Sequence, residues 1–509
     1  MLNSHTPDFH RRSNPIRLNH ILAWNGPLVT LLALTVAFTA GLLLIQLTPL
    51  GGVLFVGLAL LSVATVIEPL SGLAAALFLG LLWAYLRAEV PQIPAQIAQL
   101  FVALTLAVWL ARGLLRRKFI VPCPPAVSHA VCETNFLLLP LLTFIGAASF
   151  SLWDAGEIFV YGVPELIKWV QILLLYLFIS DHITPRRLPW LLSILLLIGL
   201  FQASVGAWQF GLRGEGPDHF AILSLGEHFY RAYGTFEQPN PYAGYLGLTL
   251  SVAMGALWGG VSKWINGERE GEWPRILLYL ISTIAIFAAL GMSWSRGAWL
   301  GFGAAGLAMA FALPRDTRWG LLLVAALVAI GLGLYAIDVI PPSLAARLTN
   351  FVQDVHLEDV RGMPINDANY AVVERLAHWQ AALEMLRYNL WTGVGFGCYE
   401  AAYSQFALIN WPVALGHAHN YYLNIAAETG LIGLAAYLLL WGAVFWQTWR
   451  LTRRADGFLR GVAIGLLGAW THLSTHHFLD NLYVNNVHLH IGVLLGLLTL
   501  ITRKVDYDH

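Results

Sequence analysis

The chain has few charged residues, which make up only 11% of its 509 positions, whereas apolar residues make up 58%. Soluble globular proteins carry about 25% charged and about 45–50% apolar residues. The net charge is zero, so bulk electrostatics identify no partner, and no nucleic acid is expected. The three cysteines imply no disulfide framework, since the predicted topology separates Cys123 and Cys132 from Cys398. The composition therefore predicts a polytopic membrane protein.

Fourteen apolar runs between residues 27 and 502 are candidates for crossing a bilayer, which takes about 20 helical residues. Some are short. The first two, or the pair within residues 50–86, could form one re-entrant or tilted unit, so twelve spans remain possible. No fixed-period repeat and no low-complexity linker divides the chain. We expect one all-α integral membrane domain, a helical bundle over residues 1–509, with a large extracytoplasmic loop at 339–418.

The basic residues fix an expected orientation. With the N-terminus inside, most of the 29 Lys and Arg residues fall inside, in clusters such as Arg112 to Lys118 and Arg450 to Arg460. The positive-inside rule then makes both termini cytoplasmic. Arg11 and Arg12 precede the first apolar run, 27–46, without a small-residue cleavage site after it, which is typical of a signal anchor.

The loop at 339–418 contains a periodic segment. Apolar residues recur there at steps of three and four, which predicts an amphipathic helix over about 368–389 that lies on the membrane or caps the bundle. Gly393, Gly395 and Gly397 follow it. Because no strand precedes these glycines and they face outward, we interpret them as a turn rather than a nucleotide loop.

Three arginines of the predicted outer side have unusual contexts. Arg296 lies at the tip of a hairpin between apolar runs, Arg231 opens a turn-rich approach to a helix, and Arg375 lies one turn before Trp379. Snorkelling, interfacial anchoring, a salt bridge or stacking on Trp379 would also explain them. However, a guanidinium donates two parallel hydrogen bonds and keeps its charge, which suits pyrophosphate.

His419 stands where a polar loop enters an apolar segment. A helix running from Asn420 would place Ala426, Gly430 and Gly433 on the face below His419, where another helix could pack closely. The positive end of that helix should hold the imidazole neutral and attract an anion such as pyrophosphate. A helix-cap histidine is the alternative. Glu428, deeper in the helix, is expected to brace a neighbouring helix.

No metal site is predicted. Asp354, Glu358 and Asp359 are loosely spaced, as on a solvated loop. The C-terminal histidines fit interfacial packing and hydrogen bonding better than zinc, because no cysteine or tight carboxylate set accompanies them. Asp480 among them is a plausible partner for a catalytic Arg or His. The histidines concerned are His472, His476, His477, His488 and His490.

Two short signatures resemble those of the O-antigen ligase superfamily, which includes O-antigen ligases, related polymerases and protein O-oligosaccharyltransferases. One is Arg-x3-Leu, present as Arg296 to Leu300. The other is His-Asn-x9-Gly-x2-Gly, present as His419-Asn420 through Gly430 and Gly433. The segment at Arg231 also looks like the family's first essential arginine region, and the likeness extends over residues 225–490.

This resemblance implies a GT-C type glycosyltransferase that transfers a glycan from undecaprenyl pyrophosphate to an acceptor hydroxyl on the outer face of the bacterial cytoplasmic membrane. His419 would be the base, and Arg231 and Arg296 would hold the pyrophosphate. Arg375, Asn420 and Asp480 are further candidates for substrate binding. No cofactor and no metal is implied. The partners would be the lipid-linked glycan, membrane lipid and an acceptor that is a lipid, a saccharide or a protein.

Two alternatives stay open within this interpretation. A polymerase or a protein O-oligosaccharyltransferase would use the same donor chemistry. A transporter is an alternative from another class, because some members of the superfamily are described as bicarbonate transporters. Transport would favour ionisable residues near the bilayer midplane and two related halves, whereas the ionisable residues here gather at the predicted outer rim.

Overall fold

The computed structural model describes residues 48–90, 94–115, 136–222, 225–226, 228–267, 272–341, 347, 359–366 and 369–508. The chain divides into two compact units, residues 1–63 and residues 64–509. Several predictions fall outside the described residues, namely the signal anchor with Arg11 and Arg12, the run 27–46, Cys123, Cys132, Asp354 and Glu358.

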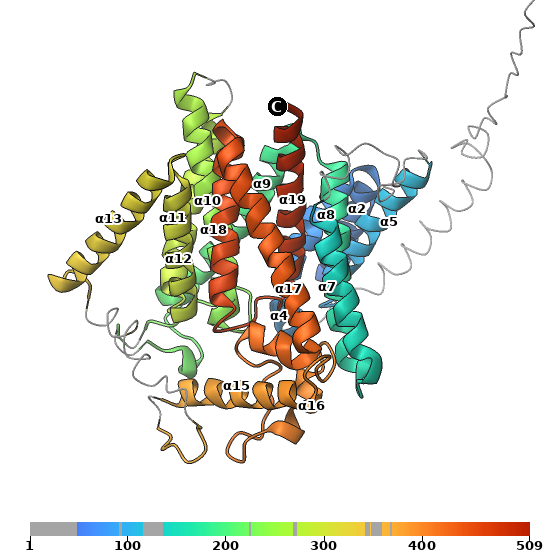
Figure 1. Cartoon of the computed structure of the whole chain (residues 1–509). Coiled ribbons are helices and arrows are strands. Elements are labelled where there is room, and N and C mark those ends of the chain that lie inside the picture. Colours follow the sequence, from blue (N-terminus) through green and yellow to red (C-terminus); the bar gives the residue numbers. More distant parts are fainter. Residues whose placement is uncertain are drawn as a thin grey trace, which may run out of the picture. The chain divides into compact units, whose positions relative to one another are not determined.

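Helices form the regular structure of the described residues, as the sequence predicts (Figure 1). In chain order they are α2 (Pro49–Ile67), α3 (Pro69–Leu81), α4 (Trp83–Glu89), α5 (Ile97–Leu115), α7 (Leu138–Ser151), α8 (Val163–His182), α9 (Leu188–Ala207), α10 (Pro239–Ile265), α11 (Trp273–Met292), α12 (Arg296–Ala312), α13 (Thr317–Ala336), α15 (Tyr370–Tyr388), α16 (Tyr399–Phe406), α17 (Tyr421–Arg454), α18 (Gly457–His476) and α19 (Val487–Asp508).

Within the described ranges, eight helices are long and apolar enough to cross a membrane. A ninth span is possible if α3 and α4, which are bent by 63° at Leu82, count as one broken or re-entrant unit. The sequence allowed a re-entrant or tilted unit made from the pair of runs within 50–86, whereas the observed bend at Leu82 lies within the second run of that pair. Other predicted runs correspond to shorter helices, such as α7 with 14 residues and α12 with 17. The prediction of a polytopic helical membrane protein is therefore confirmed.

Helix α18 packs closely against α10 through glycines on both helices. A methyl group at Gly255 of α10 would lie 2.4 Å from the carbonyl oxygen of Gly461, and one at Gly465 would lie 2.8 Å from that of Ser251. Small residues let the two backbones approach each other, as is common between membrane helices. This close packing fixes the end of α18, which carries His476.

The bundle has two chemically different ends. At one end, which we call the cavity end, α10, α12 and α17 begin, α18 ends, and α15 lies across them (Figure 1). At the opposite end, arginines of the predicted inner side donate to carbonyl oxygens at helix ends: Arg315 to those of Arg453 and Ala455, Arg460 to those of Ala312 and Thr452, and Arg503 to that of Ser180. The structure thus separates these arginines from Arg231, Arg296 and Arg375.

The predicted amphipathic helix over 368–389 is present as α15, Tyr370–Tyr388. It buries Val372 and Leu376 against Trp411, and Met385 against Tyr399 and neighbouring residues. The apolar side of α15 therefore belongs to a small core at the cavity end, and this core holds the helix in place beside the ends of the membrane helices.

The expectation of a continuous small-residue face below His419 is wrong. Gly430 has φ 63° and ψ −165°, which break α17 at this point. A Cβ there would lie 2.2 Å from the carbonyl carbon of Trp391, and the N–H of Leu431 donates to the carbonyl of Leu390 at 2.9 Å. Gly430 therefore accommodates the backbone of a loop and not a second helix. Gly433 faces Thr429 of its own helix.

The glycine-rich segment after α15 is a turn, as predicted. Gly393, Gly395 and Gly397 all have positive φ, a conformation that favours glycine. Glu428, which is 3% exposed, accepts a hydrogen bond from the backbone N–H of Tyr399 at 3.2 Å. Since Tyr399 is the first residue of α16, Glu428 braces the start of a neighbouring helix, as expected.

Candidate functional site

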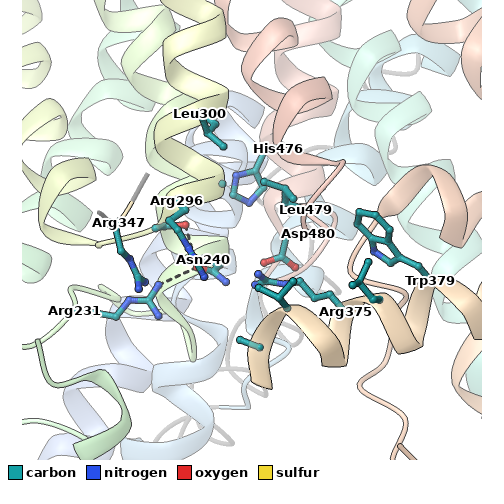
Figure 2. A pocket seen from close by; sticks show the side chains of 15 residues that line it. Arg231, Asn240, Arg296, Leu300, Arg347, Arg375, Trp379, His476, Leu479 and Asp480 are labelled. Carbon is teal, nitrogen blue, oxygen red and sulfur yellow. Dashed lines mark hydrogen bonds between the residues drawn. The ribbon is translucent and has the colours of Figure 1, made fainter. Parts of the chain in front are cut away.

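A cavity of about 270 Å³ lies at the cavity end, between the ends of α10, α12 and α18 and one side of α15. Figure 2 shows Arg231, Arg296, Arg347 and Asn240 on one side of it and Trp379 on the other, with Arg375 and Asp480 between them. The remaining lining residues include Ser295, Gly297, Leu300, Leu376, His476 and Leu479.

A tight turn before α12 anchors two of the arginines. Trp294 in this turn has φ 53°, which directs successive carbonyl groups toward both guanidinium groups. Arg231 Nε donates to the carbonyl of Ser293 at 3.1 Å, and Arg347 donates to the carbonyl of Trp294 at 3.1 Å. The turn therefore holds two cations at one wall of the cavity.

Asn240 connects this wall to the start of α10. Its Oδ1 accepts a hydrogen bond from Arg231 and another from the hydroxyl of Ser295, both at 3.0 Å. Because the Ser295 hydroxyl is used in this way, it does not cap α12, and Arg296 begins that helix at the cavity wall. The positive ends of α10 and α12 both meet the cavity, which favours an anion there.

The cavity is strongly cationic, since the described residues that line it include four arginines and one carboxylate, Asp480. Burial, followed by repulsion from the neighbouring arginines, lowers the pKa of Arg231 to about 9 and that of Arg347 to about 10. Both groups remain charged at neutral pH. Clustered cations of this kind are costly when empty and are relieved by a bound anion.

Asp480 follows the end of α18 and is 7% exposed. Burial alone would raise its pKa, but His417, His419, His476 and Arg375 outweigh burial and leave the pKa below its usual value. The carboxylate is therefore ionised at neutral pH. It stands between the arginine side of the cavity and Trp379 (Figure 2).

His419 is not among the described residues that line the cavity, and both of its ring nitrogens are buried. Its ring contacts the rings of His417 and His378, with centroids 4.5 Å and 5.7 Å away. Burial, with a smaller effect of His417, lowers the pKa of His419 to about 3, so the ring is neutral as expected. Burial is the largest cause of this lowered pKa, whereas the sequence argument attributed the neutral ring to the positive end of the helix.

Asn420 has a structural role at this place. Its Oδ1 accepts the backbone N–H of Leu423 at 3.1 Å and so caps α17. Like His419, Asn420 is not among the described residues that line the cavity. Its inclusion among the substrate-binding residues stays a prediction that this geometry does not favour.

His417, His419 and Asp480 could in principle hold a metal ion, because one ligand atom of each lies within 4.8 Å of the others. However, Nδ1 of His417 accepts the backbone N–H of His419 at 3.0 Å. A neutral imidazole that accepts at Nδ1 carries its proton on Nε2, so the nitrogen that faces Asp480 has no free lone pair for a metal. The residues do not fit a three-ligand site.

Three of the C-terminal histidines are occupied by packing and hydrogen bonds. His472 donates to the carbonyl of Gly244 at 3.0 Å, His490 to that of Leu77 at 3.2 Å, and His488 to the side chain of Gln171 at 2.8 Å. His476 differs, because it lines the cavity and both of its ring nitrogens are buried without a partner.

The structure brings four predicted site residues, Arg231, Arg296, Arg375 and Asp480, to one cavity. Sequence reasoning missed Arg347, Asn240 and His417, and it assigned His476 to interfacial packing and hydrogen bonding. Two of these residues had a signal, since His417 lies two residues before His419 in a short polar run and Asn240 lies in the turn-rich segment that Arg231 opens.

The fold and the cavity define a multi-pass membrane protein with a cationic site at one end of its helices. Residues 281–438 match the family described as O-antigen ligase, and this match supports the resemblance to the O-antigen ligase superfamily. This match includes α12, α15, Arg375 and His419 and leaves out Arg231 and Asp480. At the level of the family it supports glycan transfer of the ligase or polymerase type. No curated protein matches the chain significantly.

Proposed function

We propose that this protein transfers a glycan from an undecaprenyl-pyrophosphate donor to an acceptor hydroxyl group. The observation that carries the proposal is the convergence of four arginines and two helix N-termini on one cavity. A diphosphate is the group in such a donor that needs this much positive charge. Bidentate hydrogen bonds from guanidinium groups suit its oxygens.

The reaction divides between the two sides of the cavity. The oxygen of the acceptor hydroxyl bonds to the anomeric carbon of the donor sugar, and the bond from that carbon to the pyrophosphate oxygen breaks. Undecaprenyl pyrophosphate leaves with the electron pair, and the arginines stabilise its growing charge. The hydroxyl proton passes first to the carboxylate of Asp480, which stands at the cavity wall, and from there to the neutral ring of His419 beside it. The chain's own cations supply the charge stabilisation in this scheme.

The acceptor would approach from the side of Trp379. The indole Nε1 is buried without a partner beside the cavity, and the ring lies across from the arginines. An acceptor that is a growing glycan would make the protein a polymerase, and a protein acceptor would make it an oligosaccharyltransferase. Product analysis separates these: lengthening lipid-linked chains indicate polymerisation, and glycosylated protein indicates the other activity.

The position of the charged cavity residues bears on the transporter alternative and on the orientation of the protein in the membrane. The charged residues of the cavity lie at helix ends, which favours transfer at a membrane surface over passage through the midplane. By the positive-inside rule, we propose that the cavity end faces the outside of the bacterial cytoplasmic membrane and that both termini are cytoplasmic.

The test is transfer of a radiolabelled glycan from purified undecaprenyl-pyrophosphate donor in native membranes. A glycosyl pyrophosphate is acid-labile, so label in an acid-stable product reports transfer to any acceptor. We expect His419→Ala, Arg296→Gln and Arg375→Gln to reduce transfer about 100-fold or more. The matched control is Arg387→Gln, on the same helix as Arg375 but exposed and paired with Glu384. Undiminished transfer by the first three variants would refute the proposal.

A further inference from the structure

His417 contacts both parts of the proposed proton acceptor. The backbone N–H of His419 donates to its Nδ1 at 3.0 Å, and its Nε2 lies 3.5 Å from Oδ1 of Asp480. Because Nδ1 accepts, the proton of the neutral ring is on Nε2 and faces the carboxylate. The tautomer of His417 with its proton on Nε2 therefore fits both contacts, and the ring of His417 connects the backbone of His419 to the carboxylate of Asp480.

His419 needs such a support. Its φ of 53° is unusual for a residue other than glycine and costs about 1–3 kcal/mol unless the surroundings enforce it. Its side chain gains no hydrogen bond that would fix it, because both ring nitrogens are buried without a partner. Among the described contacts of the residue, the hydrogen bond to His417 is the one that fixes its backbone from a side chain.

The rest of the turn is fixed independently. The N–H of Ala418 donates to Oδ1 of Asn424 at 3.0 Å, and the N–H of Tyr421 donates to the carbonyl of His477 at 2.7 Å. These bonds hold the residues on either side of His419 and leave the direction of its ring to His417.

We propose that His417 is a positioning residue, which sets the relative geometry of His419 and Asp480 and is not itself a base or a metal ligand. The proposal rests on the proposed function, since the pair it positions is the proton acceptor of that reaction. A displacement of about 1 Å in such a group can cost about 100-fold in rate. Arg231, Arg296 and Arg347 lie on the side of the cavity away from Trp379 (Figure 2), so their binding of the donor should be unaffected.

Two conservative variants separate the two contacts. In His417→Asn, the side-chain oxygen can replace Nδ1 as the acceptor for the N–H of His419, but the group no longer reaches Asp480. In His417→Gln, the amide NH2 can replace Nε2–H toward Asp480, but the acceptor at the Nδ1 position is lost. His417→Ala removes both. The control is His490→Asn, a buried histidine that donates only to the carbonyl of Leu77.

The readout is glycan transfer at varied donor concentration. We expect His417→Ala to lower kcat about 100-fold with the KM for the donor changed less than about threefold. Each conservative variant should recover part of that loss, and His490→Asn should keep the full kcat. A kcat for His417→Ala within about twofold of the wild type would overturn the proposal. So would a loss confined to KM.

The pH profile provides a second readout that a structural role would not move. Without a donor at the Nε2 position, the pKa of Asp480 rises, so the acid limb of kcat/KM moves to higher pH in His417→Ala and His417→Asn but not in His417→Gln. Asp480 also faces His419, His476 and Arg375, and every variant retains these. An unchanged profile in all three variants would contradict the inference.

Three outcomes distinguish a failure of the positioning role of His417 from a failure of the proposed glycan transfer and from a metal-binding role. Absence of transfer by the wild type, or full transfer by His419→Ala, means that the proposed function fails. Loss in His419→Ala with full activity in His417→Ala means that the inference alone fails. Stimulation of wild-type transfer by added Zn²⁺, lost in His417→Asn, would assign a metal site instead. Folding of each variant is checked by the thermal shift with inorganic pyrophosphate, which should equal that of the wild type.

Discussion

Replacing Arg231 by methionine should abolish anion binding and leave the fold almost as stable as before. The fall in the pKa of Arg231 to about 9 corresponds to about 5 kcal/mol of cost for the charged form, which is present at neutral pH. Its hydrogen bonds to Ser293 and Asn240 return about 1.5–3 kcal/mol each. The two effects nearly cancel, and Asn240 keeps its bond from Ser295. We expect the free energy of unfolding to change by less than about 2 kcal/mol.

The assay is thermal unfolding in detergent with and without inorganic pyrophosphate. A ligand at 100 times its Kd stabilises the folded state by about 2.7 kcal/mol, so the wild type should gain this amount and Arg231→Met should gain almost nothing. The matched comparison is Arg460→Met at the opposite end, where the guanidinium donates to three helix-end carbonyls and its loss should cost about 3 kcal/mol or more. If Arg231→Met were as destabilised as Arg460→Met, Arg231 would be a structural brace.

Three further outcomes can be measured. Because burial holds the pKa of His419 near 3 and the pKa of Asp480 is also low, kcat/KM should show no acid limb between about pH 5 and 8, whereas a limb near 6.5 would show an ordinary histidine. Gly430→Ala should lower the free energy of unfolding by about 3 kcal/mol or more, since φ is 63° and a Cβ would meet the backbone of Trp391, while Gly442→Ala, with open space around it, should be neutral. Asn240→Ala should lower kcat/KM about tenfold by releasing Arg231, and an unchanged value would show that the turn before α12 suffices.

Two features of the structure were predicted from periodic or topological signals in the sequence, namely α15 and the grouping of three arginines on one side of the bundle. The spacing of apolar residues predicted α15 to within two residues at its start and one at its end. The outer-side assignment of Arg231, Arg296 and Arg375 agrees with their meeting in one cavity. Both signals come from the hydrophobic effect acting on many residues at once, which is why they survive without knowledge of the tertiary structure.

The details that depend on single backbone angles could not be predicted. The sequence argument assumed a continuous helix after Asn420, but Gly430 breaks it where the loop at Trp391 packs. The sequence argument likewise did not foresee the positive φ of His419 or its absence from the described residues that line the cavity. Arg347 belongs to no motif and reaches the site only because the turn at Trp294 offers a carbonyl.

The cavity has a mixed origin along the chain. Arg296, Arg375 and Trp379 belong to the segment that matches the ligase family, while Arg231, Asn240, His476 and Asp480 come from parts of the chain before and after it. A chimera that exchanged residues 281–438 as one block would join Arg296, Arg347 and Arg375 of one protein to the counterparts of Arg231 and Asp480 in another. The substrate preference of such a hybrid should match that of the protein that supplied the block only when the start of α10 and the end of α18 are exchanged together with the block.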